Sequence, residues 1–261
     1  MRMNNLRYHP IFLTCTRNSL STNNMIKKIA IPLLIPVLLF QSCLGESDPI
    51  PETIDTYHYY YNYLLESYAL QWEIDEIILG SGHEYGIPAE AIVTLDETEQ
   101  EVLIRSRNAE NQQLIDSLSY TMFEYGAYMI ALLGSEEEPN LICEVMDTRV
   151  PSSGRVKFRF LHASKSMGPV DIYIGGDQPD YLALAEVDFS QVSEYLEATE
   201  EQLWTSVIVT PANSLPGDST ILEYTANTIF QTGGIYLCTI SHLSNSNESP
   251  FQIQVDYQPV F

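Results

Sequence analysis

Residues 156–176 read VKFRFLHASKSMGPVDIYIGG, and this stretch decides the fold class. Its first five residues alternate between apolar and basic side chains, which is typical of a strand with one buried face and one solvated face. The sequence Met167-Gly168-Pro169 then breaks the pattern, and a second alternation covers residues 170–174. Gly175 and Gly176 follow, and glycine has the backbone freedom that a tight turn requires. The stretch therefore predicts strand, loop, strand and turn.

A weaker copy of this unit lies upstream. Residues 57–64, YHYYYNYL, align with residues 156–163 at a shift of 99 positions (57 to 156). Collinear order is harder to obtain by chance than any single match, so we predict an internal duplication. The further segment pairs that keep this order are 72–74 with 170–172, 85–90 with 189–194, and 124–130 with 232–238.

Short strand-like runs continue through both copies, separated by Gly, Pro, Asn and Asp. This pattern predicts an all-β protein with two tandem immunoglobulin-like β-sandwich domains rather than alternating strands and helices. We place the domains at residues 57–147 and 155–261, with a linker that contains the sequence PSSG between them. The additional runs are residues 91–95, 102–106, 114–120, 141–145, 182–187, 204–210, 221–228 and 251–257.

The strands of the second copy are similar to a known family. Residues 159–164, RFLHAS, and residues 170–176, VDIYIGG, resemble the motifs "vRfvHaSp" and "vDvYvdG" of the extracytoplasmic bacterial domain-of-unknown-function family 4397. Lys165 stands where that family usually has proline. The resemblance implies β-sandwich domains, often in tandem, in secreted or lipid-anchored proteins. It supplies no catalytic residue.

The first 42 residues contain five basic side chains and no acidic one, which marks a targeting segment. A basic start at residues 25–28 precedes an apolar run at residues 29–40, and Ser42 then precedes Cys43. This order resembles a bacterial lipoprotein signal with Cys43 as the lipidated residue. A plain secretory signal, which would leave Cys43 as an ordinary thiol, is the alternative. The apolar run is too short for a transmembrane helix, which needs about 20 residues.

We therefore expect residues 1–42 to be an N-terminal extension and signal peptide, with Met25 as the true start. Residues 43–56 are polar and contain two prolines, so we expect them to form a tether. A lipid anchor attaches a protein to a membrane without spanning it. The expected location is the outer membrane of a bacterial cell envelope, on its periplasmic or surface side.

The charge beyond residue 42 is strongly negative. Removing the five basic residues of the targeting segment from the total of 12 leaves seven against 35 acidic residues, a formal charge of −28. Such a surface repels nucleic acid and anionic membranes, so neither is an expected partner. It favours cations or basic partners.

Cys143 and Cys238 are the two cysteines that remain after Cys43. In an oxidising compartment they could form a disulfide. They lie in different predicted domains, and cysteine is also a small buried hydrophobe. Both interpretations stay open at this point.

The run of tyrosines at residues 57–63 raises the alternative of a glycan-binding surface. The shift of 99 places Tyr57, Tyr59 and Tyr61 on the core face and leaves His58, Tyr60 and Asn62 outside. One exposed tyrosine, Tyr60, would be a poor platform for a sugar. Core packing is therefore the preferred interpretation.

Candidate metal and catalytic groups are scattered. The histidines have neither zinc-site nor metalloprotease spacing, and His162 is in phase with the core residue Phe160. Acidic runs at residues 96–99, 136–138 and 177–180 lack the pattern of a calcium loop and are typical of solvated loops. There is no nucleophile elbow, phosphate loop or nucleotide-binding fingerprint. The remaining candidate histidines are His58, His83 and His242.

We therefore expect no catalytic residue, no metal and no cofactor. The prediction is a lipid-anchored envelope protein that acts as a non-catalytic interaction or structural module, with an envelope protein or a glycan as partner. An extracytoplasmic glycan- or calcium-binding module is the alternative. Loops at the ends of the sandwiches are the expected contact surfaces, because rigid β scaffolds place binding residues there.

Overall fold

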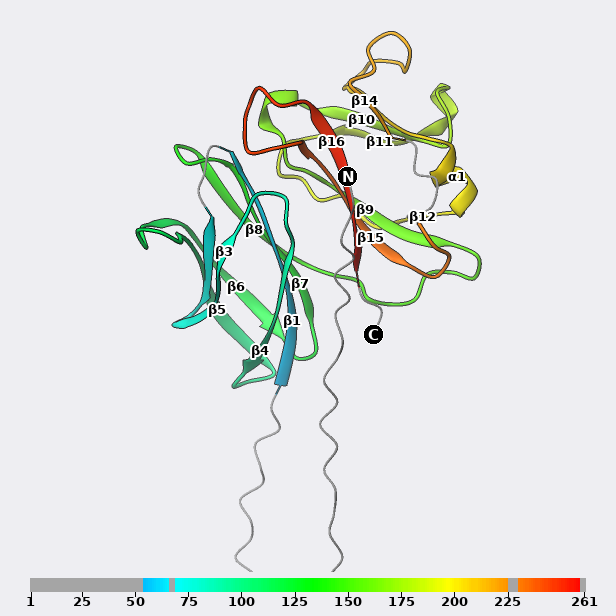
Figure 1. Cartoon of the computed structure of the whole chain (residues 1–261). Helices are drawn as coiled ribbons and strands as arrows, with labels where there is room; N and C mark the ends of the chain where they lie inside the picture. Colours follow the sequence, from blue (N-terminus) through cyan, green and yellow to red (C-terminus); the bar gives the residue numbers. More distant parts are fainter. Residues whose placement is uncertain (1–53, 66–68, 225–229, 259–261) are drawn as a thin grey trace, which may run out of the picture. The chain divides into compact units, whose positions relative to one another are not determined.

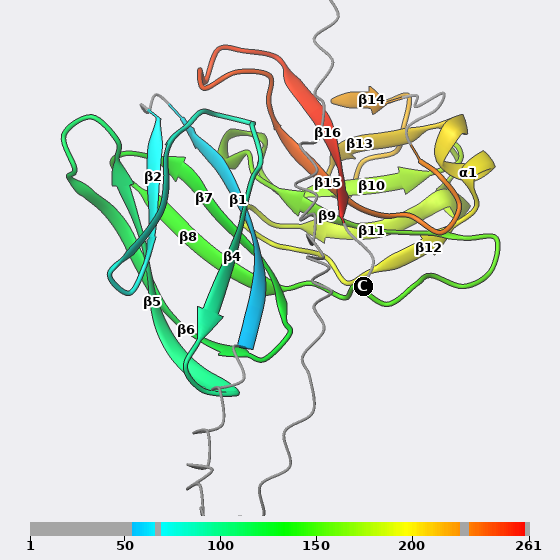
Figure 2. The ribbon, with the colours of Figure 1, turned by 60° about the horizontal axis from the view of Figure 1, so that its bottom comes forward.

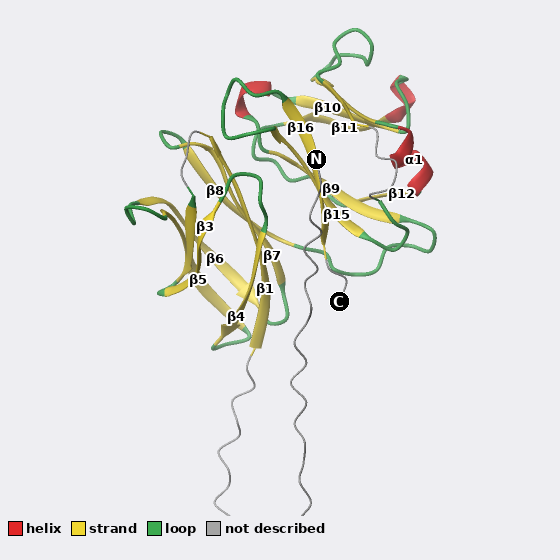
Figure 3. Cartoon of the chain, viewed as in Figure 1, coloured by secondary structure: helices red, strands yellow, loops and turns green. Residues whose placement is uncertain are grey.

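The computed structural model describes residues 54–65, 69–224 and 230–258, which belong to one compact unit (Figure 1). Within these residues the chain is almost entirely β-structure, as Figure 3 shows. Sixteen strands form four sheets of four strands each. No helix in the described ranges is long and apolar enough to cross a membrane. The predicted signal peptide, Cys43 and most of the tether lie outside the described residues.

The first domain is a sandwich of two sheets, with strand orders β4-β1-β7-β8 and β3-β2-β5-β6. Figure 2 shows β1 between β4 and β7. Since β1 begins at Ile54, the first domain starts inside the segment predicted as tether. Its strands are β1 (Ile54–Leu65), β2 (Leu70–Ile74), β3 (Ile77–His83), β4 (Ala89–Leu95), β5 (Glu99–Asn108), β6 (Leu114–Phe123), β7 (Ala127–Ser135) and β8 (Pro139–Val145).

The second domain repeats this topology, with strand orders β12-β9-β15-β16 and β11-β10-β13-β14. Each strand order of the second domain is that of the first domain with eight added to every strand number. The prediction of two tandem β-sandwich domains is therefore confirmed. Its elements are β9 (Val156–His162), β10 (Val170–Ile174), β11 (Leu182–Val187), β12 (Leu196–Ala198), α1 (Glu200–Thr205), β13 (Val207–Pro211), β14 (Leu222–Tyr224), β15 (Ile235–His242) and β16 (Phe251–Gln258), with 3-10 turns at Lys165–Met167 and Pro179–Tyr181.

In both domains the first strand is central and runs parallel to the seventh, as β1 does beside β7 and β9 beside β15. In the immunoglobulin constant arrangement the first strand lies at a sheet edge. The likeness to immunoglobulin domains therefore lies in the two-layer architecture and not in the strand order.

A tyrosine fixes the turn before the seventh strand in each domain. The Tyr128 hydroxyl accepts a hydrogen bond of 2.5 Å from the backbone N–H of Phe123, and the Tyr236 hydroxyl accepts one of 2.9 Å from Gln231. A Cβ atom on Gly126 would lie 2.6 Å from the Tyr128 side chain, and the same holds for Gly234 and Tyr236. The glycine two positions before the tyrosine lets its ring fold back, as in the tyrosine corner of immunoglobulin domains.

These two tyrosines correct the predicted alignment of the repeats. Tyr128 pairs with His58 on β1, whereas Tyr236 pairs with Phe158 on β9. His58 therefore corresponds to Phe158 at a shift of 100, and the predicted shift of 99 is wrong. A slip of one residue exchanges the two faces of a strand. Tyr60 accordingly lies in the sandwich core, only 2% exposed, with its ring centroid 5.2 Å from that of Trp72.

The other face of β1 is also buried. Its tyrosines, Tyr59, Tyr61 and Tyr63, belong to an apolar cluster that contains Leu161 and Leu237 of the second domain. We call this the inter-domain cluster. Since β1 is covered on both faces, its sequence lacks the alternation that would have fixed its phase. Hydrogen bonds that cross the same boundary are Tyr85 Oη to the His242 carbonyl, 3.2 Å, and Gln254 Nε2 to the Gly86 carbonyl, 2.8 Å.

Residues 204–210, predicted as a strand, are divided between two elements. Helix α1 covers Glu200–Thr205, and β13 begins at Val207. Thr199 and Gln202 form a capping box, in which each side chain bonds the backbone N–H of the other. This start signal for a helix was present in the sequence and outweighs the short β-branched pattern.

Candidate functional site

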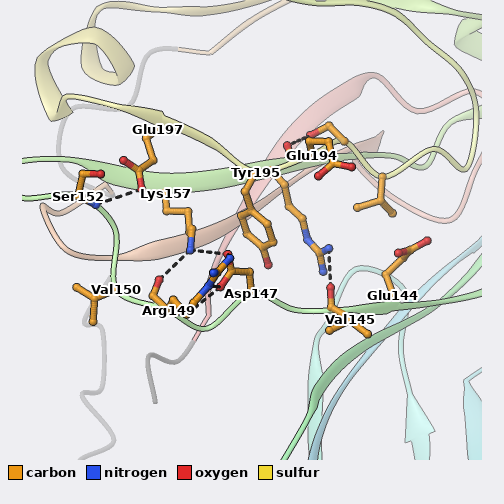
Figure 4. Close-up of a pocket in the computed structure, with 13 residues that line it drawn as sticks. Glu144, Val145, Asp147, Arg149, Val150, Ser152, Lys157, Glu194, Tyr195 and Glu197 are labelled. Carbon is orange, nitrogen blue, oxygen red and sulfur yellow. Dashed lines mark hydrogen bonds and ion pairs between the residues drawn. The ribbon is translucent and has the colours of Figure 1, made fainter. Parts of the chain in front are cut away.

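A cleft lies where the linker crosses the first strand of the second domain (Figure 4). Its volume is about 820 Å³, and its walls come from the end of β8, the linker, β9, the segment before β12 and β12 itself. We call it the linker cleft. Its lining residues are Glu144, Val145, Asp147, Arg149, Val150, Ser152, Lys157, Arg159, Val192, Ser193, Glu194, Tyr195 and Glu197.

Strand alternation positions the two basic residues of β9. Phe158 and Phe160 belong to the core of the second sandwich, so Lys157 and Arg159 point to the opposite face. That face is covered by the linker and by Tyr195, so both cations are buried rather than solvated. This burial is what the strand pattern alone could not predict.

Lys157 is held by the linker. Its ammonium group lies 2.9 Å from the Asp147 carboxylate and donates a 2.8 Å hydrogen bond to the Arg149 carbonyl, as Figure 4 shows. The Arg149 guanidinium bonds the same carboxylate through two nitrogen atoms, at 2.8 and 2.7 Å. Hydrogen bonds from Arg149 and then from Lys157 hold the pKa of Asp147 well below its usual range. Arg149 is 87% exposed, so its own pairing adds little stability.

Arg159 is only 3% exposed. Its Nη1 donates a 3.1 Å hydrogen bond to the Val145 carbonyl. The carbon at the centre of its guanidinium lies 4.8 Å from the centroid of the Tyr195 ring, within the range of a cation–π contact. Its Nε and Nη2 atoms are buried and have no hydrogen-bond partner among the described residues.

Tyr195 and the acidic residues complete the cleft. The Tyr195 hydroxyl donates a 3.1 Å hydrogen bond to Gln258 Oε1, and burial raises the pKa of this phenol. Glu197 accepts a 3.1 Å hydrogen bond from the Ser152 backbone, and contacts with Ser152 lower its pKa. Glu144 and Glu194 are exposed, and neither carboxylate takes part in an ion pair within the described part of the chain.

The sequence contained a signal for this cleft that the prediction did not use. Five of the seven basic residues beyond residue 42 fall within residues 149–165. Three of the five, Arg149, Lys157 and Arg159, line the cleft. A basic segment in so acidic a chain indicates a local function for positive charge. The other two are Arg155 and Lys165.

The two cysteines predicted as a possible pair are free thiols. Cys143 lies in the core of the first sandwich and Cys238 in the core of the second. Burial raises the pKa of both thiols. The disulfide interpretation is therefore replaced by the alternative, in which each cysteine is a small buried apolar side chain.

Among the candidate histidines, His162 and His58 have structural hydrogen bonds. His162 Nε2 lies 2.8 Å from the Gly168 carbonyl oxygen, and burial lowers its pKa. His58 contacts the hydroxyl groups of Thr56 and Tyr60 at 2.8 and 3.0 Å, and burial lowers its pKa to about 4. Across the described ranges no group of three His, Cys, Asp or Glu side chains is placed to hold a metal ion.

The glycan alternative loses the residue on which it depended, because Tyr60 is a core side chain and not an exposed one. No protein-family model matches this chain, and a search of curated proteins also gives no match. The linker cleft is therefore the candidate site, on the geometry of its own residues.

Proposed function

We propose that this chain is a lipid-anchored protein of the bacterial cell envelope that acts as a non-catalytic interaction module and binds its partner at the linker cleft. The anchor is supported by the order of basic, apolar and small residues before Cys43. Resemblance of the second repeat to an extracytoplasmic family supports the location. The site is supported by the buried cations of the cleft.

The observation that carries the binding role is the burial of Lys157 and Arg159. Moving a cation out of water costs free energy unless partners replace the lost hydration. Lys157 has such partners, whereas two donors of Arg159 have none. Positive charge held in fixed positions in so acidic a chain is the feature on which we base the binding role. The two sandwiches serve as the rigid support for the cleft.

The anchoring part is tested by labelling cells with radioactive palmitate while they express the full chain as wild type, Cys43→Ala or Cys143→Ala. We expect label in the wild type and in Cys143→Ala, and none in Cys43→Ala. Cys143 is the matched control because it stays in the chain after the predicted signal peptide is removed. Equal labelling of Cys43→Ala, or none in the wild type, would contradict the anchor.

The side of the membrane is tested by adding protease to intact cells. Cleavage of the wild type indicates a surface protein, and protection until the outer envelope is opened indicates a periplasmic one. Turnover of a substrate in a broad hydrolase screen would contradict the non-catalytic role.

A further inference from the structure

A smaller pocket opens at one edge of the second sandwich, between β11 and β12 and beside α1 (Figure 2). Its volume is about 380 Å³, within the range of small-ligand sites. We call it the edge pocket. Its inner lining includes the core side chains Phe158 and Ile174, and its outer lining includes the exposed Tyr181 and Leu182. Glu197 is the one lining residue that it shares with the linker cleft.

The first sandwich is closed at the corresponding place. Ile54 and Leu95 pair there across β1 and β4, and both side chains belong to the sandwich core. At the repeat shift of 100, Gly154 stands at the position of Ile54. The pairings of β4 and β12 likewise match Leu95 to Glu200, the first residue of α1. The described part of the second domain therefore has no apolar pair at this end, and the pocket lies beside the positions that such a pair would fill.

A longer loop in the second repeat adds an aromatic wall. β2 and β3 are joined by residues 75–76, whereas β10 and β11 are joined by residues 175–181, which end in a 3-10 turn. The Tyr181 ring packs on the backbone of Gly176, where a Cβ atom would lie 2.5 Å from the ring. Tyr181 is nevertheless 43% exposed. The second glycine of the pair that predicted a turn thus makes room for an exposed aromatic ring at the mouth of the pocket.

Exposed polar side chains of two kinds surround this ring, and a ligand can reach them from solvent. Asp180 and Glu197 provide acceptors, and Arg155 and Gln202 provide donors. A ligand rich in hydroxyl groups can use both kinds, because a hydroxyl both donates and accepts. A pyranose sugar also has an apolar C–H face that can pack on an aromatic ring. A neutral sugar is not repelled by a chain that carries −28 beyond its targeting segment.

We propose that the edge pocket binds one pyranose unit of a neutral glycan. A C–H face of the sugar packs on the Tyr181 ring, and its hydroxyl groups bond to Asp180 and Arg155. This tyrosine is not Tyr60, on which the glycan alternative had depended. The competing occupant is an apolar side chain of a partner protein, which would cover the polar groups of the rim without bonding them. The inference goes beyond the proposed function and depends on neither the linker cleft nor the lipid anchor.

The test is saturation-transfer NMR with calorimetry on the full chain carrying Cys43→Ala, so that lipidation does not enter. The probes are glucose, galactose, N-acetylglucosamine and cyclohexanol at millimolar concentrations. We expect at least one of the sugars to bind, with saturation strongest at the protons of one C–H face. Cyclohexanol keeps a six-membered ring but has a single hydroxyl group, so it should bind more weakly than that sugar.

Tyr181→Ala removes the ring and should weaken binding of that sugar about tenfold. Tyr181→Phe keeps the ring and should retain binding. Tyr125→Ala is the matched control, because Tyr125 is an exposed tyrosine of the first domain and does not line the pocket. A thermal melt of each variant establishes that it is folded. If Tyr181→Ala does not fold, Asp180→Ala replaces it, and should weaken binding because an acceptor for the hydroxyl groups is lost.

Three results would overturn the proposal: no binding of any of the three sugars to the folded parent chain, unchanged sugar affinity in the folded pocket variant, or cyclohexanol binding at least as tightly as the sugars. The last result would assign the pocket to an apolar side chain instead. None of these measurements involves the palmitate label or the linker cleft, so a failure here and a failure of the proposed function are distinguishable.

Discussion

Tyr125 and Gly233 occupy the same position in the two repeats, and both have a left-handed backbone, with φ angles of 55° and 85°. Each directly precedes the glycine of its tyrosine corner, Gly126 or Gly234. Glycine adopts this conformation without steric cost, whereas another L-residue incurs about 1–2 kcal/mol. The second repeat therefore has the relaxed form of this turn, and the first repeat has the strained form.

Replacing Tyr125 by glycine should stabilise the first domain. The strain that is relieved exceeds the entropy cost of the added glycine, which leaves about 0.5–1 kcal/mol. Urea unfolding monitored by fluorescence would measure the change. Tyr125→Ala is the control, because alanine keeps the strain. An equal gain in Tyr125→Ala would mean that removal of the 66% exposed ring, and not the backbone, is responsible.

Gly126→Ala should destabilise the first domain by about 1–3 kcal/mol, because the new methyl group overlaps the Tyr128 side chain. The cause can be isolated by a double-mutant cycle with Tyr128→Ala, again by urea unfolding. Once the ring is absent, the cost of Gly126→Ala should largely disappear. Purely additive effects would exclude a clash between these two positions.

The two core thiols should be unreactive in the folded protein. Burial keeps Cys143 and Cys238 protonated and inaccessible, and only a thiolate reacts readily. With Cys43→Ala and Cys15→Ala in place, we expect no labelling by a thiol reagent in buffer and two labelled sites in urea, with or without reductant. Sites that label in urea only after reduction would restore the disulfide interpretation.

Asp147 should make stability fall in acid. The pKa of Asp147 is lower in the folded state than in the unfolded state. Its contribution to the free energy of unfolding is therefore complete above the unfolded-state pKa of about 3.9, and is lost as the pH falls toward the folded-state pKa. Asp147→Asn removes the partner of buried Lys157 and should cost about 1–3 kcal/mol at neutral pH. Urea midpoints measured from neutral pH down to pH about 3 should fall less steeply in this variant. Parallel curves would show that Asp147 does not contribute.

Asp256 provides the opposite case. Burial raises the pKa of Asp256 in the folded state, so its ionisation opposes folding when the pH is above that folded-state pKa. This penalty disappears as the pH falls below the pKa of the unfolded state. Asp256→Asn should therefore raise the urea midpoint at neutral pH and steepen the loss in acid. A lower midpoint at neutral pH would indicate that the hydrogen bonds from Gln254, at 3.0 and 3.1 Å, outweigh the desolvation.

Local patterns in the sequence were sufficient for the two-domain architecture. Val156, Phe158 and Phe160 alternate with charged residues because only one face of β9 meets its own sandwich core. The collinear repeat predicted the duplicated topology. These features depend on contacts within one strand pair or one turn, where residue spacing translates directly into geometry.

Register and site needed the tertiary structure. Tyr59 and Tyr60 lie on opposite faces of β1, and both are buried, one in the inter-domain cluster and the other in the sandwich core. A strand that is covered on both faces has no alternation of polar and apolar residues. The sequence therefore could not distinguish an alignment shift of 99 between the repeats from one of 100. Likewise, alternation turned Arg159 away from its core, but only packing of the linker and Tyr195 over β9 made that face a buried cleft. When a segment distant in sequence packs over one face of a strand, the residue pattern of the strand does not change. The alternation shows only which face a residue lies on, not what covers that face.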